Sequence, residues 1–238
     1  MDGASALYDG KKLYSRGKRN EGQNISELMK YIKFPELPEG VMVRGEIIMA
    51  RGVFQSKYER KDPSETDKFS NSRNAVAGLV NKMGSNAAKG VPTPMTPLRE
   101  QFVHDLRFIA YEYISPEPIK ASEQFKKLDS LFGENVAKHE QVQTIDDESL
   151  SKLYDRYIAE LDFEIDGVVV CDDAVYVRPY GENPDYLRAF KKPLAILTSR
   201  TRVTAVTWEV SKEGFLRPVV HFNPVNLNGA MTGKATGH

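Results

Sequence analysis

Two short apolar runs in this chain each carry acidic residues, and this feature limits the possible folds more than any other. Residues 43–49 read Val-Arg-Gly-Glu-Ile-Ile-Met, and residues 163–170 read Phe-Glu-Ile-Asp-Gly-Val-Val-Val. Both runs are typical of β-strands, in which alternate side chains share one face. Burial of the Glu46 or Asp166 carboxylate is costly unless a cation, a metal or a hydroxyl group compensates for it. The runs therefore predict strands that border a polar site, although either acid alone also fits a strand end facing water or a structural arginine partner.

The net charge of the chain is zero, with 33 basic and 33 acidic residues among 238. The charge is nevertheless unevenly distributed. Basic residues gather in two stretches, namely Lys11, Lys12, Arg16, Lys18 and Arg19, and later Arg188, Lys191, Lys192, Arg200 and Arg202. Affinity for nucleic acid depends on the face that meets the phosphates, so zero net charge does not exclude a DNA partner. Such a stretch is equally typical of a solvated surface.

Cysteine usage and hydropathy indicate the compartment. Cys171 is the one cysteine of the sequence, which excludes an internal disulfide framework and a cysteine-rich zinc module within these residues. No apolar run is long enough to cross a bilayer, and the start shows no signal-peptide pattern. We expect a soluble cytoplasmic protein, with no membrane partner, that is a monomer.

The pattern of apolar residues predicts an α+β fold. Residues 4–8 and 12–15 flank Asp9-Gly10, which is typical of a hairpin with a type I′ turn. Helical spacing predicts helices over 25–32, with Asn24 as N-cap, and over 76–83, 125–132 and 150–161. Residues 106–114 are predicted to form a strand, and the polar stretches 55–68 and 84–97 surface loops. Alternating runs at 202–210 and 216–222 follow a predicted domain boundary at Pro193.

Four motifs occur in a fixed order: Asp2-Gly3, Val-Arg-Gly-Glu at 43–46, Asp-Gly-Val-Val at 166–169 and Ala-Phe-Lys at 189–191. Transfer of a nucleotide requires a cation near the α-phosphate, a carboxylate for ribose hydroxyls or Mg²⁺, and a nucleophile. The ordered set resembles the adenylation domain of NAD-dependent DNA ligases. Further segments are similar to that family, namely residues 15–26, the Ser-Arg-Asn-Ala-Val-Ala-Gly string at 72–78, and residues 223–225 with 235–238.

The resemblance implies a fold and a reaction. Residues 1–193 would form a nucleotidyltransferase (adenylation) domain of antiparallel sheets with flanking helices. Residues 194–238 would form the first strands of an OB-fold β-barrel, which needs more chain to be complete. The implied activity seals nicks in double-stranded DNA through enzyme-AMP and DNA-adenylate intermediates, with NAD as the AMP donor and Mg²⁺ as the metal.

The resemblance also implies roles for individual residues. Lys191 matches the lysine that contacts the adenylate phosphate, Glu46 the acid that contacts the ribose, and Asp166 an acid that acts in catalysis through the metal. The implied catalytic residues are Asp2, Asp166 and Lys191. The implied cofactor-binding residues are Gly3, Arg16, Glu46, Tyr111 and Lys191. Those implied for DNA are Arg73, Lys82 and Lys212, and those implied for the metal are Asp166 and Glu46.

The chain departs from the family pattern at several positions. The nucleophilic lysine of Lys-x-Asp-Gly would lie just before Met1, so we expect that these 238 residues alone cannot be adenylated. Five residues after Asp166 the family has a nucleotide-contacting lysine, whereas this chain has Cys171. Eight residues after Arg73 stands Asn81 in place of an arginine, with Lys82 as a possible substitute. This divergence resembles phage and viral ligases more than bacterial ones.

Two other classes of protein fit parts of the pattern. An ATP-dependent ligase or capping-type nucleotidyltransferase shares the Asp-Gly, Glu and Lys framework. A non-catalytic nucleic-acid-binding module would use the two basic stretches to follow phosphates, with salt-sensitive DNA binding and no affinity for AMP or NAD.

Overall fold

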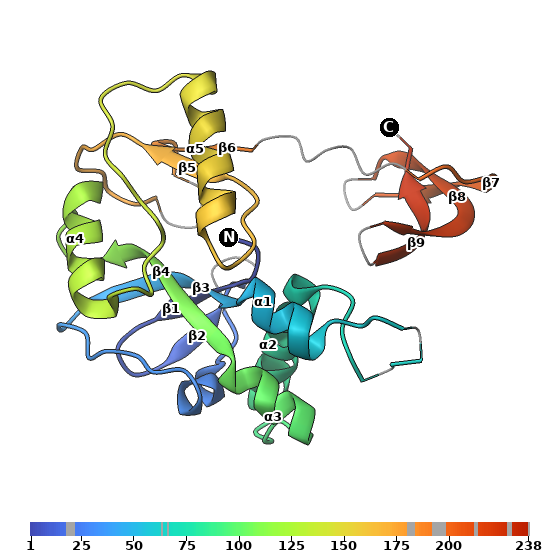
Figure 1. The fold of residues 1–238 in the computed structure, drawn as a ribbon, viewed down its shortest axis with the longest axis horizontal. Helices are drawn as coiled ribbons and strands as arrows, with labels where there is room; N and C mark the ends of the chain where they lie inside the picture. The colour runs from blue at the N-terminus through green and yellow to red at the C-terminus, as the bar shows by residue number, and fades with distance from the viewer. Residues whose placement is uncertain are drawn as a thin grey trace. The chain divides into compact units, whose positions relative to one another are not determined.

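A computed structural model describes residues 1–17, 22–62, 64–65, 67–179, 184–191, 199–211, 214–227 and 230–237. The chain divides into two compact units, residues 1–192 and residues 193–238 (Figure 1). The predicted site residues that are described all belong to the first unit. Its helices and strands are therefore what positions the site.

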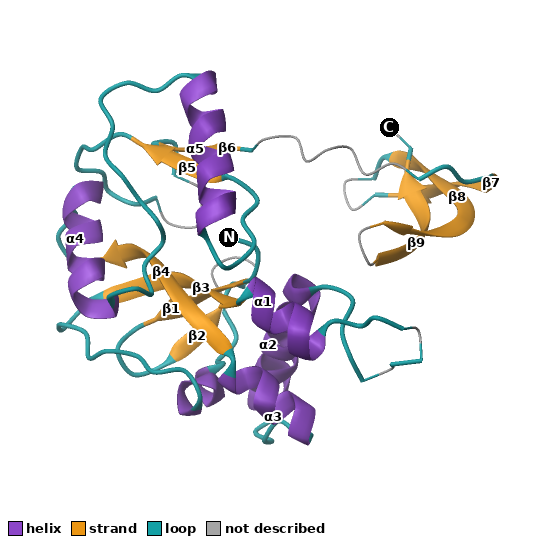
Figure 2. Cartoon of the chain, viewed as in Figure 1, coloured by secondary structure: helices purple, strands orange, loops and turns teal. Residues whose placement is uncertain are grey.

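A four-stranded antiparallel sheet forms the centre of the first unit, with the strand order β2-β1-β3-β4 (Figure 2). The strands are β1 (Ala4–Tyr8), β2 (Leu13–Ser15), β3 (Met42–Met49) and β4 (Leu106–Ile114). Alternate residues of each strand are buried in the main hydrophobic core, among them Tyr8, Val43, Ile47 and Phe108. The opposite face of the sheet, which we call the site face, carries the polar residues of β3.

The pairing of β3 with β4 is interrupted by a β-bulge. Gly45 lies opposite Ala110, but Arg44 lies opposite Glu112, so Tyr111 is an extra residue on β4. Ala110 and Tyr113 are both buried in the core, three positions apart rather than two. The bulge therefore leaves two consecutive β4 residues, Tyr111 and Glu112, outside the core.

The helices of the first unit are the 3₁₀ helix η1 (Ser26–Lys30), α1 (Arg51–Val53), the π-helical turn η2 (Phe54–Tyr58), α2 (Ser72–Ala88), α3 (Pro97–His104), α4 (Ala121–Phe132) and α5 (Asp147–Glu160). Among them, α4 packs against β4, and α2 packs against β1, β2 and β3 (Figure 2). Asn71 caps α2 by accepting a hydrogen bond from the Asn74 N–H, and Gly133, at φ 58°, ends α4. The predicted helices at 76–83, 125–132 and 150–161 are thus confirmed, as is the strand at 106–114.

Two local predictions are wrong, one of a helix and one of a turn type. The helix expected over 25–32 is the short η1, and Asn24 accepts a hydrogen bond from the Ser26 N–H instead of capping an α-helix. The predicted hairpin is confirmed, because β1 and β2 pair antiparallel, but its expected type I′ turn is not. Four residues connect Tyr8 to its partner Leu13, and the Asp9 carboxylate accepts the Lys11 and Lys12 N–H groups.

The two predicted surface loops are also partly wrong. The stretch 55–68 begins with η2, whose Tyr58 side chain is fully buried and donates a hydrogen bond to Asp105 at 2.6 Å. The stretch 84–97 begins inside α2, which continues to Ala88. The ends of η2 and α2 are determined by the burial of their apolar side chains, which the polar composition of these two stretches does not indicate.

The strand predicted over 163–170 is correct only in its second half. Strand β5 (Val168–Cys171) pairs antiparallel with β6 (Leu187–Phe190), whereas residues 163–166 lie outside any strand. This two-stranded sheet carries Asp166 just before β5 and Lys191 just after β6.

The second unit is a three-stranded antiparallel sheet of β7 (Val203–Val210), β8 (Leu216–Leu227) and β9 (Ala230–Thr236). Several of its large apolar side chains are more than half exposed, namely Val206, Trp208, Val210 and Leu216. The OB-fold assignment of this unit stays a prediction. Across the described part of both units, no helix combines the length and apolar character required to cross a membrane.

Candidate active site

Glu46 lies at the centre of the site face. It shares this face with Arg44 and Ile48, while Val43, Gly45 and Ile47 point into the core. Burial raises the pKa of Glu46 to about 7, against the lowering effect of the N-terminal amino group and of a hydrogen bond from the Gly3 backbone. The Asp166 carboxylate raises the pKa of Glu46 further, and the Arg73 guanidinium lowers it. Glu46 is therefore a largely desolvated acid that can hold a proton near neutral pH.

The Asp2-Gly3 dipeptide packs closely against β3. A Cβ atom on Gly3 would lie 2.1 Å from the Ile47 carbonyl oxygen, so no larger residue fits without movement of the backbone. The Asp2 N–H donates a hydrogen bond to the Glu164 carbonyl at 2.9 Å, and the Asp2 carboxylate pairs with Arg73 at 2.6 Å. This dipeptide thus joins β3, the start of α2 and the segment that leads to Asp166.

Asp166 and Lys191 form an ion pair, with 2.9 Å between the Asp166 Oδ2 and Lys191 Nζ atoms. The N-terminal nitrogen of Met1 lies 3.4 Å from Asp166 Oδ1. Burial by itself would raise the pKa of Asp166, but the Lys191 hydrogen bond and the N-terminal charge outweigh it and hold this pKa below its usual value. Gly167 allows the close approach of the two strands, because a Cβ atom there would lie 2.6 Å from the Phe190 carbonyl oxygen.

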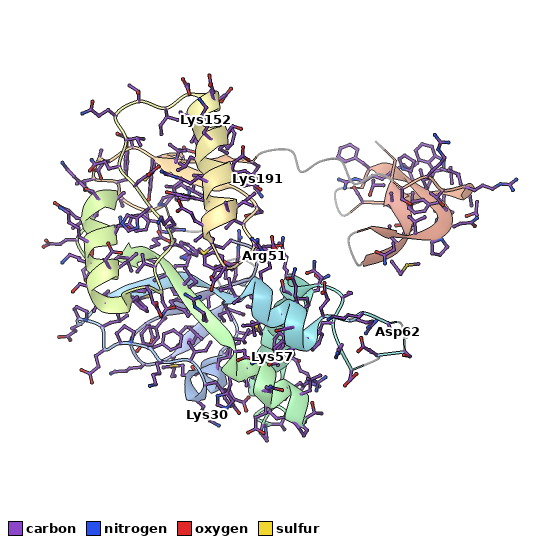
Figure 3. All side chains as sticks on the ribbon, in the orientation of Figure 1. Lys30, Arg51, Lys57, Asp62, Lys152 and Lys191 are labelled. Carbon is purple, nitrogen blue, oxygen red and sulfur yellow. The ribbon has the colours of Figure 1, made fainter. Side chains whose placement is uncertain are left out.

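The segment before Asp166 is held by two arginines that the sequence pattern did not identify. The Arg51 backbone N–H donates to the Asp162 carbonyl at 2.5 Å, and its guanidinium pairs with Glu164 at 2.8 Å. The Arg107 guanidinium pairs with Asp162 at 2.8 Å. Phe163 is buried between these contacts against Ile48 and Ile109. Figure 3 labels Arg51, the first residue of α1, and Lys191, which directly follows β6.

A second polar pair lies beside Glu46 on the site face, because Ser5 of β1 is directly opposite Glu46. The Tyr111 hydroxyl lies 2.9 Å from the Ser5 Oγ atom. Burial raises the pKa of Tyr111, which the Ser5 hydrogen bond opposes, while the nearby Glu46 charge raises it and the Arg44 and Arg16 charges lower it. These electrostatic effects place Arg16 and Glu46 in the neighbourhood of the Tyr111 hydroxyl, although the Arg16 side chain is exposed.

The structure brings most of the predicted site residues together. Asp2, Gly3, Glu46, Arg73, Asp166 and Lys191 form one connected group, and Arg16 and Tyr111 lie beside it. Lys82 lies on α2, and none of its described contacts reaches this group. Lys212 lies outside the described residues. Cys171 is partly buried, and burial together with Asp173 and Asp172 raises the pKa of its thiol, which is the opposite of an activated cysteine.

The carboxylates do not form a dedicated metal cage. In the part of the chain that the structure describes, no three or more His, Cys, Asp or Glu residues gather as metal ligands. Mg²⁺ commonly binds through one or two carboxylates together with substrate phosphates and water. Asp166 and Glu46 fit that kind of site, with Lys191 as a competitor for Asp166.

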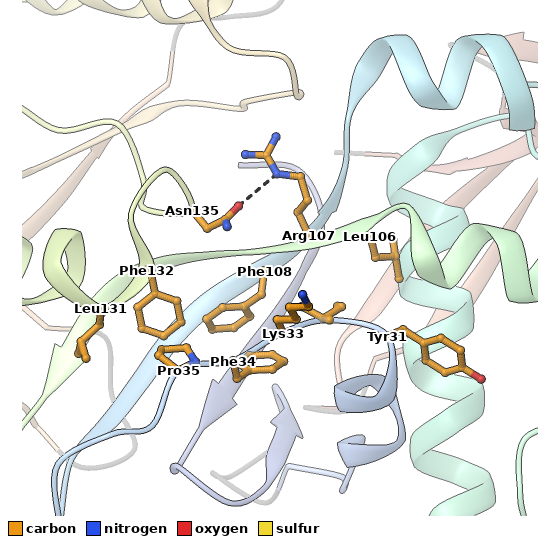
Figure 4. Close-up of a pocket in the computed structure, with 11 residues that line it drawn as sticks. Tyr31, Lys33, Phe34, Pro35, Leu106, Arg107, Phe108, Leu131, Phe132 and Asn135 are labelled. Carbon is orange, nitrogen blue, oxygen red and sulfur yellow. Dashed lines mark hydrogen bonds between the residues drawn. The ribbon is translucent and has the colours of Figure 1, made fainter.

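A separate concavity of about 350 Å³ lies beside β4 (Figure 4). Its lining is mainly aromatic and aliphatic, with Phe34, Phe108 and Phe132 close together and Asn135 accepting a hydrogen bond from Arg107 at 3.2 Å. The described residues that line it include none of the predicted site residues. It is therefore distinct from the group around Glu46 and Asp166.

Comparisons with known proteins identify the family of the chain. Residues 11–183 match the family described as NAD-dependent DNA ligase adenylation domain. The chain is 31% identical to "Putative DNA ligase 205R" of Invertebrate iridescent virus 6 and 31% identical to "DNA ligase" of Acanthamoeba polyphaga mimivirus, in both cases over the whole chain. It is 29% identical, over 98% of its length, to "DNA ligase" of Wolbachia pipientis wMel.

The chain covers 37%, 35% and 34% of these three relatives, so it spans little more than a third of their length. A solved structure titled "DNA binding with a minimal scaffold: Structure-function analysis of Lig E DNA ligases" has a similar fold, with a TM-score of 0.52 and 15% sequence identity. The alignment covers 99% of this chain and 74% of that chain. At this identity the likeness concerns the fold alone.

Proposed function

This chain belongs to the family of NAD-dependent DNA ligase adenylation domains, and on that premise we propose that it holds the adenylate pocket of an enzyme that seals nicks in duplex DNA. NAD is the AMP donor in this proposal, and the reaction passes through enzyme-AMP and DNA-adenylate intermediates. The observation that supports the proposal most strongly is the connected group of Asp2, Glu46, Arg73, Asp166 and Lys191. Four separated stretches of sequence meet in it.

The contacts of each residue suggest its task. The exposed end of Lys191 is free to turn from Asp166 to a phosphate and to stabilise the charge that develops there, because its side chain is 63% exposed. Glu46 is partly buried and its pKa is raised to about 7, so a ribose hydroxyl can satisfy it in either protonation state. Tyr111, whose hydroxyl contacts the Ser5 side chain opposite Glu46, presents an aromatic ring suited to a nucleobase.

Mg²⁺, when bound, supplies a Lewis acid that neutralises phosphate charge. Asp166 and Glu46 are the residues that would hold it. Asp166 suits this task because its low pKa keeps it ionised. Arg73 and Lys82 on α2 are proposed to contact the DNA phosphates, and Lys212 is proposed for the same task in the second unit. The OB-fold assignment of that unit, with a boundary near Pro193, is part of the same proposal.

Binding of AMP tests the proposal directly, because it does not require a nucleophile. Isothermal titration of the 238-residue chain with AMP should give measurable affinity, which added NAD competes away. Lys191→Met should weaken binding about tenfold, as expected for loss of a charged hydrogen bond. Lys152→Met is the matched control, because Lys152 pairs with Glu148 on α5 in the same way, outside the site group. Salt-sensitive DNA binding without affinity for AMP would refute the pocket and favour a nucleic-acid-binding module.

A further inference from the structure

Glu112 is held between two arginines at the end of the site face where the β-bulge lies. Its Oε2 atom is 3.4 Å from the Arg44 Nε atom, and its Oε1 atom forms a close ion pair with the Arg178 guanidinium. Arg178 belongs to the connection between β5 and β6, so it reaches the sheet from another segment. The three side chains are only 28% (Arg178), 31% (Arg44) and 17% (Glu112) exposed.

The position of this trio along β3 is informative. Ile48, Glu46 and Arg44 follow one another on the site face at steps of two residues, about 7 Å each. Asp166 and Lys191 act near Glu46, and Met1 packs with Ile48 and Ile109. A nucleotide with its phosphate near Lys191 and its ribose at Glu46 therefore extends its base toward Tyr111 and Glu112.

The charges of the trio do not cancel. Two guanidinium groups meet one carboxylate, which leaves one positive charge in a partly buried place. Burial and the neighbouring Arg44 charge lower the pKa of Arg178, whereas the Tyr186 and Tyr111 hydroxyls raise it. The Tyr111 hydroxyl therefore lies within electrostatic range of Arg178.

Resting on the proposed function, we propose that Arg178 and Glu112 form the base-reading end of the adenylate pocket, where the Arg178 guanidinium donates to a ring nitrogen of adenine and the Glu112 carboxylate accepts from its amino group. Arg44 fixes Glu112 and is a positioning residue. The β-bulge is what makes the arrangement possible, because it places Tyr111 and Glu112 next to each other outside the core. The base would pack on the former and hydrogen-bond to the latter.

This arrangement predicts selectivity for one purine. Adenine presents an amino donor beside a ring-nitrogen acceptor, whereas hypoxanthine presents an oxygen acceptor beside an N–H donor. A fixed donor and a fixed acceptor side by side match only one of these patterns, and the mismatched base leaves buried polar groups unpaired. If Arg178 and Glu112 only held the β5–β6 connection in place, without contact to the base, the chain would show no preference for AMP over IMP.

Titration of the 238-residue chain with AMP and with IMP tests the inference. We expect AMP to bind at least tenfold more tightly than IMP. Arg178→Met should weaken AMP binding tenfold or more and reduce the AMP-to-IMP preference below threefold, whereas Arg156→Met should change neither. Arg156, which lies on α5, is the matched control because its guanidinium also forms a direct ion pair with a glutamate, Glu140.

The outcomes separate this inference from the function on which it rests. Absence of AMP binding in the unaltered chain would refute the proposed function itself. If the unaltered chain bound AMP and IMP with equal affinity, the inference would be overturned, while the proposed function would stand. This measurement needs no variant. The inference would also be overturned if Arg178→Met lost affinity for AMP and for IMP by the same factor. That result would mean that the three side chains only hold the β5–β6 connection in place.

Discussion

Replacement of Glu46 by glutamine should stabilise the first unit at neutral and alkaline pH. The pKa of Glu46 is raised by burial from 4.5 to about 7 in the folded chain. A carboxyl group with a raised pKa binds more protons in the folded state than in the unfolded state between these two values. The folded chain therefore loses stability as the pH rises from about 4.5 to about 7. Glutamine keeps the size of the side chain and removes the titration.

The size of the effect follows from the difference in pKa. A difference of about 2.5 pH units corresponds to roughly 3 kcal/mol, at about 1.36 kcal/mol per unit. This is an upper limit, because Glu46 keeps some contact with water, and we expect Glu46→Gln to raise the free energy of unfolding by about 1 to 3 kcal/mol at pH 8. The gain should vanish near pH 4, where both side chains are neutral.

Two spectroscopic probes report on the two units separately. The helices in the described part of the chain all lie between residues 26 and 160, so circular dichroism at 222 nm follows the first unit during urea unfolding. Trp208, the one tryptophan of the sequence, lies in the second unit and gives a fluorescence control whose transition should not move. A destabilising effect of Glu46→Gln, or a gain that is the same at pH 4 and pH 8, would refute the reasoning.

Four further substitutions have expected outcomes. Gly3→Ala should destabilise the first unit by about 2 kcal/mol or more, because the new Cβ atom would meet the Ile47 carbonyl oxygen. Gly78→Ala is the control and should be neutral or stabilising, because Gly78 lies in α2 with open space around it. Equal effects of the two substitutions on urea unfolding would contradict this prediction. Tyr58→Phe should cost about 1 to 2 kcal/mol, because the buried hydroxyl donates to Asp105. An unchanged unfolding midpoint would show that this hydrogen bond contributes nothing. Lys191→Met should raise the pKa of Asp166 in a carboxyl NMR titration, because the Lys191 ammonium group is a main cause of the lowered value. The free energy of unfolding should change little at this exposed site. An unchanged pKa of Asp166 would mean that the ion pair does not persist in solution.

The helices were the most predictable part of the fold, because local chemistry determines their ends. An Asn side chain caps α2 and a glycine with positive φ ends α4. The 25–32 segment failed because its apolar spacing suits both a helix and a single 3₁₀ turn followed by extended chain. The difference between them is made by tertiary contacts, such as the hydrogen bond from the Ile25 N–H to the Leu13 carbonyl.

The candidate site was predictable in its acids and its lysine but not in its arginines. Motif order identified Glu46, Asp166 and Lys191, because these residues stand in recognisable strings. Arg51 and Arg178 stand in no such string, and their importance depends on which distant segment they meet. Arg51 meets residues 162–164, and Arg178 meets a glutamate that a β-bulge turns out of the core. Periodicity alone cannot predict a bulge, because one extra residue changes the face of every residue beyond it.

The opposite pKa shifts of Glu46 and Asp166 divide the chemistry of the site. Both acids lie in the same group, but burial dominates at Glu46, whereas at Asp166 the effects of Lys191 and of the N-terminal amino group together outweigh burial. Two carboxyl groups whose pKa values are driven apart in this way can act in different protonation states at one pH. Asp166 stays ionised and suits a cation, while Glu46 can donate or accept a hydrogen bond near pH 7. The folded chain keeps Glu46 in spite of its cost to stability, which is the pattern expected where an acid serves a ligand rather than the fold.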